Sequence, residues 1–213
     1  MKIGVIGSGV VAQTLGAGFL RNGHQVALGT REPKKLADWR AKNPLGDVLS
    51  FAEAGAFGEV VVLAVGGEVA LAALEHTGEL ALKGKTVIDA CNPIGGGPPV
   101  NGVLSYFTSL KDSLMERLQK AHPETYFVKA FNSVGNAQMV NPHFSGGRPT
   151  MFICGNDAAA KTSVAALCDE LGWDVEDMGA VEAARAIEPL CMLWCIPGVG
   201  KGDWSPHAFK LLR

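Results

Sequence analysis

Residues 2–12 read KIGVIGSGVVA, an apolar run typical of a buried strand, passing at once into the pattern G-x-G-x-x-A. In proteins with this pattern a helix follows the strand, and the pyrophosphate of a dinucleotide lies on the helix N-terminus. Gly7 permits a tight turn, and Gly9 lets the backbone approach the phosphates because it has no Cβ. The free N–H groups of the first helical turn and the helix dipole favour an anion there. The hexad therefore predicts a dinucleotide site.

The residues after the hexad supply the context that such a site requires. Apolar residues recur at helical spacing from Val10 to Phe19, Asn22-Gly23 ends the predicted helix, and residues 25–28, QVAL, predict a second strand. This arrangement favours a nucleotide site over a plain strand–turn–helix. Strands and helices continue to alternate, so we expect an α/β fold of the doubly wound Rossmann type with a mostly parallel sheet.

The end of the second strand discriminates between the two nicotinamide cofactors. An NAD site usually has Asp or Glu there to bind the ribose 2′-hydroxyl, but this chain has Gly29-Thr30-Arg31, and its first acid is Glu32. Thr30 offers a hydroxyl, Arg31 a planar guanidinium suited to phosphate, and Lys34 and Lys35 follow on the next turn. The alternative is that these residues form the solvent-exposed, basic first turn of a helix and bind no phosphate. The pattern favours NADPH.

Length and composition bound the remaining possibilities. The chain has 213 residues, 47% hydrophobic and 19% charged, which suits a well-buried core. We expect one NAD(P)-binding Rossmann-like domain over 1–213, with a core over 1–145 and a small α/β extension and terminal helix over 146–213; a nucleotide domain with a small appendix is the other arrangement for this length. The formal net charge of −2 and the pI of about 6.2 indicate no nucleic-acid partner.

Residues 3–20 carry no charge and resemble a signal peptide or membrane span at first sight. Five glycines, Gln13 and Thr14 interrupt this run, so a buried strand and helix explain it better. We therefore expect no membrane partner and a cytoplasmic location. The five cysteines are odd in number and widely spaced, which favours free thiols in a reducing compartment and no zinc site.

Glycines and polar residues come directly after three later strands. Residues 59–65, EVVVLAV, predict the clearest strand, which ends at Gly66-Gly67; residues 85–89 predict another, which leads to Asn92. Residues 126–130 predict a third, followed by the polar cluster 131–136. Ligands bind at the carboxyl ends of such strands, so Gly66, Asn92 and this cluster are candidates for the ribose and nicotinamide. A plain turn at Gly66, and a turn-former before proline at Asn92, are the alternatives.

The pattern also predicts the outer elements. Apolar residues at helical spacing from Leu104 to Ala121 predict a long amphipathic helix. Residues 150–154 and 174–177 predict two strands that continue the sheet, with a helix between them that ends at Leu171.

A terminal helix is predicted from Val181. Residues 187–196 are apolar nearly all round, so we expect this segment to be buried against a second subunit. Residues 197–202, PGVGKG, predict a loop, and Trp204 and Phe209 are expected to anchor the C-terminal tail.

These motifs, together with 129–132, KAFN, resemble the coenzyme F420-dependent NADP oxidoreductases, and also the cytosolic domain of the STEAP-type metalloreductases. The resemblance covers nearly the whole chain. It implies a homodimer and direct hydride transfer between NADPH and a deazaflavin. It also implies cofactor-binding residues: Ser8, Gly9, Val10 and Val11 at the pyrophosphate, Thr30, Arg31 and Lys35 at the 2′-phosphate, and Val65, Asn92 and Asn136 as further contacts. Gly7 and Gly66, which the glycine patterns predict, complete the set of candidate cofactor-binding residues.

Two positions depart from that family. Gly66-Gly67 stands where the deazaflavin enzymes carry proline and an aromatic residue, and Asn132 stands where a histidine is expected. Both lie toward the second substrate, so the acceptor is left as a deazaflavin, a flavin or a related small molecule.

Hydride transfer requires alignment of two reacting atoms rather than a nucleophile or metal. The sequence contains no Ser–His–Asp or Cys–His constellation, and its five histidines lie in helix-end or loop contexts typical of the surface. We therefore name no catalytic residue. Two other functions stay open: a non-catalytic NADPH sensor or partner-binding protein, and a reductase of the pyrroline-carboxylate reductase type, although little chain is left for the helical domain which that type requires.

Overall fold

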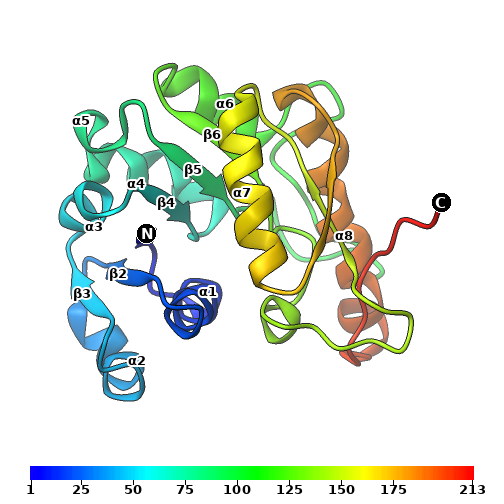
Figure 1. Cartoon of the computed structure of the whole chain (residues 1–213). Helices are drawn as coiled ribbons and strands as arrows, with labels where there is room; N and C mark the ends of the chain where they lie inside the picture. Colours follow the sequence, from blue (N-terminus) through cyan, green and yellow to red (C-terminus); the bar gives the residue numbers. More distant parts are fainter.

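The computed structural model describes residues 1–213 (Figure 1). Its main sheet is built from β1 Lys2–Ile6, β2 Gln25–Gly29, β3 Asp47–Leu49, β4 Val60–Leu63, β5 Thr86–Asp89 and β6 Tyr126–Lys129. All neighbouring strands are parallel, in the order β3-β2-β1-β4-β5-β6. This is the doubly wound Rossmann order, and its direction reverses between β1 and β4, where such sheets bind ligands. The predicted fold class is confirmed.

Helices cover both faces of this sheet. The α-helices are α1 Val10–Arg21, α2 Ala37–Lys42, α3 Phe51–Phe57, α4 Ala70–Thr77, α5 Glu79–Leu82, α6 Leu114–Ala121, α7 Ala158–Glu170 and α8 Ala184–Lys201. Short 3₁₀ turns are η1 Pro33–Leu36, η2 Gly67–Val69, η3 Asn136–Gln138 and η4 Val181–Ala183. No helix combines the length and the apolar character that crossing a membrane would require.

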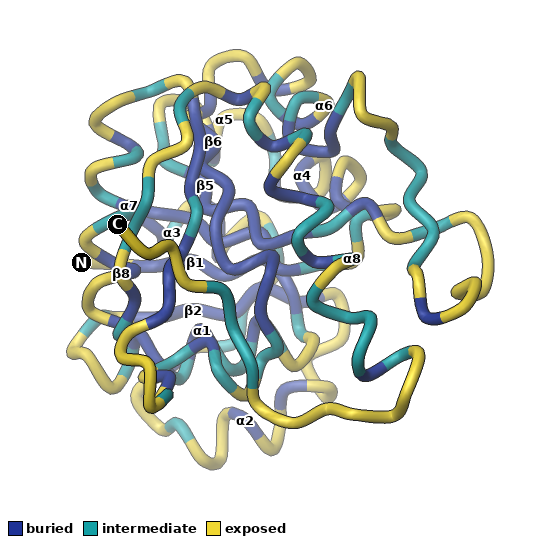
Figure 2. The backbone as a smooth tube through the Cα atoms, turned by 90° about the vertical axis from the view of Figure 1, so that its right-hand side faces the viewer, coloured by how far each residue is buried: buried dark blue, intermediate teal, exposed yellow.

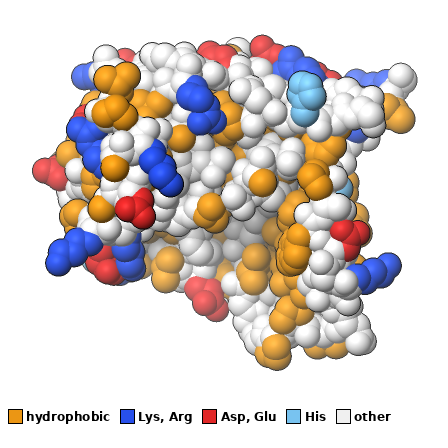
Figure 3. Space-filling model, turned by 90° about the horizontal axis from the view of Figure 1, so that it is seen from below, with side chains coloured by type: hydrophobic (Ala, Val, Ile, Leu, Met, Phe, Trp, Pro, Cys, Tyr) orange, Lys and Arg blue, Asp and Glu red, His pale blue; other side chains and the backbone are white.

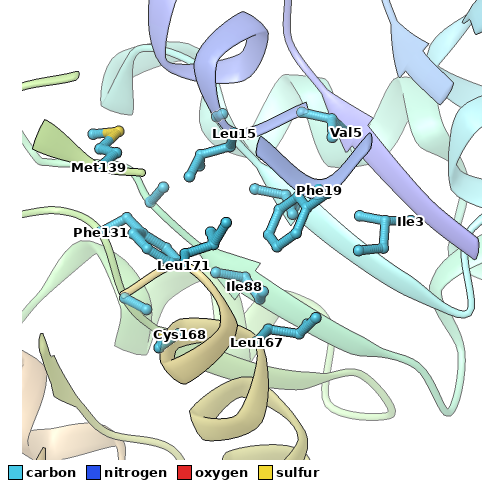
Figure 4. Close-up of a cluster of buried hydrophobic side chains, with 14 of the residues drawn as sticks. Ile3, Val5, Leu15, Phe19, Ile88, Phe131, Met139, Leu167, Cys168 and Leu171 are labelled. Atoms are coloured by element: carbon cyan, nitrogen blue, oxygen red, sulfur yellow. The ribbon is translucent and has the colours of Figure 1, made fainter. Parts of the chain in front are cut away.

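The alternation of side chains along each strand divides the core into two layers. In β4, Val60 and Val62 pack with α1 and α7, whereas Val61 and Leu63 pack with α3, α4 and α6. Figure 4 shows the first layer, in which Phe19 of α1 and Leu167 of α7 belong to one buried cluster with Ile88 of β5. Figure 2 shows the strands buried in the middle and the exposed residues confined to the outer elements. The continuous apolar run of β4 is thus explained by burial on both faces.

The last two strands do not continue the main sheet, contrary to the expectation. β7 Thr150–Ile153 and β8 Asp174–Asp177 pair in parallel as a sheet of their own, connected by α7. A single antiparallel bridge, Lys129–Cys154, joins this sheet to β6. The chain runs on from Cys154 through Gly155 into α7, which packs over the main sheet, so no further ladder forms.

The predicted helix over 104–121 is wrong in its first half, because α6 begins only at Leu114. Ser109 and Asp112 hydrogen-bond to each other and to local backbone N–H groups, and Ser113 caps α6 by accepting from the N–H of Glu116. These local bonds compete with helix formation, and they outweigh the apolar spacing. The preceding residues form a turned-back segment in which Ile94 bridges Tyr106.

The terminal helix α8 is longer than predicted, since residues 197–201 are helical and the helix ends at Gly202 in the left-handed conformation (φ 72°). Trp204 packs on Gly198, where it would lie 2.3 Å from an added Cβ, and this contact covers the last turn. His207 stacks on Trp194 with ring centroids 4.5 Å apart, and the carbonyl of Phe209 accepts from the N–H of Thr150. The tail is therefore fastened to α8 and β7.

Candidate functional site

A cavity of about 450 Å³ opens at the carboxyl ends of β1, β2 and β4, where the strand order reverses. The cavity brings together most of the predicted cofactor-binding residues, namely Gly7, Ser8, Gly9, Val10, Val11, Thr30, Arg31, Lys35, Val65 and Gly66. It is also lined by residues that the sequence did not single out for it, namely Glu32, Phe51, Ala64, Val69, Ala72, Ala73, His76 and Ala90.

The two glycines of the turn have different tasks. Gly7 has φ 143°, and a Cβ there would lie 2.2 Å from the carbonyl oxygen of Ala64, so only glycine fits the fold. Gly9 is extended (φ −74°), and no atom lies within 4 Å of the place that its Cβ would take. The open space beside Gly9 is thus room for a ligand rather than a requirement of packing.

The N-terminus of α1 at this turn is free of protein partners. No side chain caps it, and its first turn contains no acidic residue. The side chain of Gln13 donates instead to the carbonyl of Ser8, at 2.9 Å, which fixes the turn and leaves the first N–H groups of the helix unused. Because the cavity adjoins this helix end, its N–H groups and dipole are available to an anion.

The opposite end of the cavity is basic. Arg31 is exposed and forms no ion pair, whereas Lys35 Nζ lies 2.8 Å from Glu32 Oε1. The hydrogen bond and charge of Lys35 lower the pKa of Glu32 below its usual value. Thr30 is buried, and its hydroxyl accepts from the N–H of Glu32 (3.0 Å) and donates to the carbonyl of Glu32 (3.3 Å). In this conformation Thr30 shapes the turn, and the guanidinium of Arg31 is the cation left free for a ligand.

The same cavity also contains an apolar slot. Val69, Ala72, Ala73 and His76 lie on one side of η2 and α4, at helical spacing, and Phe51 contributes from the start of α3. A flat ring that binds against such a wall removes apolar surface from water and leaves no buried polar group without a hydrogen-bond partner. The helical spacing of 69, 72, 73 and 76 was visible in the sequence, but only the topology shows that this face borders the glycine turn.

Asn92 and Asn136 do not line the cavity. Asn92 Nδ2 donates to the carbonyl of Asn132 (2.8 Å), and Asn132 Nδ2 donates to Asn92 Oδ1 (3.1 Å) and to the carbonyl of Ile187 (3.0 Å). A Cβ at Gly67 would lie 2.1 Å from the carbonyl oxygen of Asn92, so this amide pair borders the glycine end of β4. Asn136 begins η3, outside the cavity.

A buried ion cluster lies between β5, β6 and α8. Lys129 is fully buried, with Nζ 2.7 Å from Asp89 Oδ2 and 2.9 Å from Glu188 Oε1, and it also donates to the carbonyl of Cys91. Burial would lower the pKa of Lys129, but the two carboxylates hold it above its usual value. Glu188 also accepts from the N–H groups of Leu114 and Met115, both at 3.0 Å. This cluster, which the sequence reasoning missed, fastens α8 and α6 to the edge of the site.

The residues that line the cavity supply groups for binding and alignment of a ligand. All five cysteines are free thiols, and no group of three or more His, Cys, Asp or Glu residues is arranged to hold a metal ion. The residues do fit a dinucleotide: a turn without side chains, a free helix N-terminus, an apolar slot and an unpaired guanidinium succeed one another along a single cavity.

Comparison with known proteins agrees with this geometry. The family model for NADP oxidoreductase, coenzyme F420-dependent, matches residues 2–93. A crystal structure from Arthrobacter sp. FB24, assigned as an F420-dependent NADP reductase, is 36% identical, covers 100% of both chains and superposes with a TM-score of 0.92.

Curated relatives match over most of this chain. The metalloreductase STEAP3 of Rattus norvegicus is 30% identical over 200 residues, which is 92% of this chain and 38% of that protein. Human metalloreductase STEAP2 is 28% identical over 193 residues, 89% of this chain and 36% of that protein. The chain thus spans little more than a third of the length of these relatives. The resemblance predicted from the sequence is confirmed, and the chain belongs to the coenzyme F420-dependent NADP oxidoreductase family.

Proposed function

We propose that this protein transfers a hydride between NADP(H) and a small-molecule acceptor, which is a deazaflavin, a flavin or a related compound. The observation that carries the proposal is the single cavity in which the free N-terminus of α1 and the unpaired Arg31 face the same ligand space. Membership of an NADP-dependent oxidoreductase family supports the proposal.

In this proposal each part of the cavity has a binding task. The N–H groups of α1 beside Gly9 bind the pyrophosphate, the slot between Phe51 and α4 takes the adenine, and Arg31 with Lys35 binds the 2′-phosphate. The nicotinamide of the bound cofactor supplies the hydride chemistry. The protein's own contribution is to hold the cofactor at a fixed place and to exclude water from the reacting side.

The acceptor would lie beyond Gly66-Gly67, next to the Asn92–Asn132 pair. Figure 3 shows a hollow with a row of hydrophobic side chains along one side and basic side chains gathered at the other end of the face. A planar, partly apolar acceptor suits such a wall. Gly66 leaves room there, since no atom lies within 4 Å of the place that its Cβ would take, and this favours a broader range of acceptors than a proline would admit.

We also propose a homodimer through the 187–196 segment of α8. Ile187 and Cys191 face inward and are buried, but Leu193 is 55% exposed on the outer face. Replacing Leu193 by Asp should shift the sedimentation coefficient from that of a dimer to that of a monomer, while the circular dichroism spectrum is retained. A monomeric unmodified protein would contradict this assembly.

The proposed reaction is tested by mixing the protein anaerobically with NADPH and, separately, F420, FMN, FAD or a ferric chelate, while absorbance at 340 nm is monitored. We expect turnover with at least one acceptor, and loss of that turnover at low NADPH in the Arg31→Ala variant. NADPH binding without oxidation by any acceptor would contradict hydride transfer and support a sensor instead.

A further inference from the structure

Glu32 introduces a negative charge into the end of the cavity that is otherwise basic. Its carboxylate and the Lys35 ammonium both line the cavity, 2.8 Å apart, and both side chains are more than half exposed. The main chain of Glu32 is fixed, because its N–H donates to Thr30 Oγ1 and its carbonyl accepts from the N–H of Lys35 at 3.0 Å. The two charges can therefore separate by rotation of either exposed side chain, without movement of this main chain.

Because of this ion pair, Arg31 and Lys35 are not equally available to bind an anionic ligand. Arg31 forms no contact ion pair, although its charge also helps to lower the pKa of Glu32, whereas Lys35 is in direct contact with the Glu32 carboxylate. A phosphate monoester carries between one and two negative charges near neutral pH. The phosphate would compete with the Glu32 carboxylate for Lys35, and the two negative groups would repel each other. An unphosphorylated ribose carries no charge and would meet no such competition.

We propose that Glu32 is a specificity-determining residue that weakens binding of the 2′-phosphate by competing for Lys35. Glu32 thereby limits the preference for NADP(H) over NAD(H). The inference rests on the proposed function and deepens it, because a dinucleotide that acts as a co-substrate has to dissociate after each turnover. An internal counter-ion that replaces the phosphate on Lys35 favours that dissociation.

The test is calorimetric titration of NADP⁺ and NAD⁺ into the full chain and into Glu32→Gln, at low and at physiological ionic strength. We expect Glu32→Gln to bind NADP⁺ roughly three- to fivefold more tightly at low ionic strength, with a smaller gain at high salt. Its affinity for NAD⁺ should stay unchanged. Glu75→Gln is the matched control, since Glu75 is exposed on α4 beside His76 but does not line the cavity.

A second background separates competition for Lys35 from direct repulsion. In Lys35→Met, the substitution Glu32→Gln should lose most of its effect, because no ammonium is left to release. An equal gain in that background, an equal gain for NAD⁺, or no gain at all would overturn the role of Glu32. Absence of NADP⁺ binding by the unmodified protein would instead contradict the proposed function itself, so the two failures are distinguishable.

Discussion

Replacing Arg31 by Ala should lower the affinity for NADP⁺ without disturbing the fold. Arg31 is exposed and forms no ion pair, so its loss should change the free energy of unfolding by no more than about 0.5 kcal/mol. The guanidinium can make one or two charge-assisted hydrogen bonds to a 2′-phosphate, each about 1.5–3 kcal/mol. One such bond corresponds to a loss of roughly 10- to 150-fold, and the solvent-exposed position favours the lower part of this range.

Titration calorimetry of NADP⁺ and NAD⁺ measures this loss. NAD⁺ affinity should be nearly unchanged in Arg31→Ala, since no phosphate faces the missing side chain. Lys34→Ala is the matched control, because Lys34 carries the same charge three residues further on but does not line the cavity. Equal losses for the two dinucleotides, or a similar loss in Lys34→Ala, would refute the assignment of Arg31 to the 2′-phosphate.

Three further sites give predictions of their own. Gly9→Asp should fold normally, because nothing lies within 4 Å of its Cβ position, but it should lose pyrophosphate binding. Gly7→Ala should lower the urea midpoint of unfolding, because its Cβ would lie 2.2 Å from a carbonyl oxygen. The reverse pattern would contradict these roles. Lys129→Met leaves two buried carboxylates without their ammonium partner, so urea unfolding should show that the free energy of unfolding falls by about 3–5 kcal/mol. A fall of less than about 1 kcal/mol would show that the cluster does not stabilise the fold. The neighbouring thiol of Cys191 lowers the pKa of Cys195 below its usual value, so alkylation of Cys195 by iodoacetamide should reach half its maximal rate below the midpoint of a free thiol, roughly 8.5. A midpoint at or above that of a free thiol would contradict this.

The features that local chemistry determines were predictable from the sequence. The glycine turn, the apolar strands and the absence of an acid after β2 each depend on a few neighbouring residues. These local patterns are enough to assign Gly7, Gly9 and Arg31 to one site, and the three residues do line one cavity. The apolar run of β4 likewise predicts a strand covered on both faces, as the two layers of the core show.

The features that were missed depend on contacts between distant residues. Residues 197–201 continue α8 because Trp204 packs back on Gly198, and the proline and glycines alone favour a loop. Asn92 bonds to Asn132, 40 residues away, rather than lining the cavity. Lys129 has the sequence context of a strand end, and only the fold brings the carboxylates of β5 and α8 to it. The spacing of residues along the chain does not predict these contacts between residues distant in sequence.

The central claim is that the cavity between the N-terminus of α1 and Arg31 binds the diphosphate and the 2′-phosphate of one NADP(H) molecule. The most direct measurement is a crystal structure of the protein grown with excess NADP⁺. We predict the pyrophosphate on the backbone N–H groups beside Gly9 and the 2′-phosphate against Arg31. An empty cavity, or a cofactor bound with its 2′-phosphate directed away from Arg31, would contradict the claim.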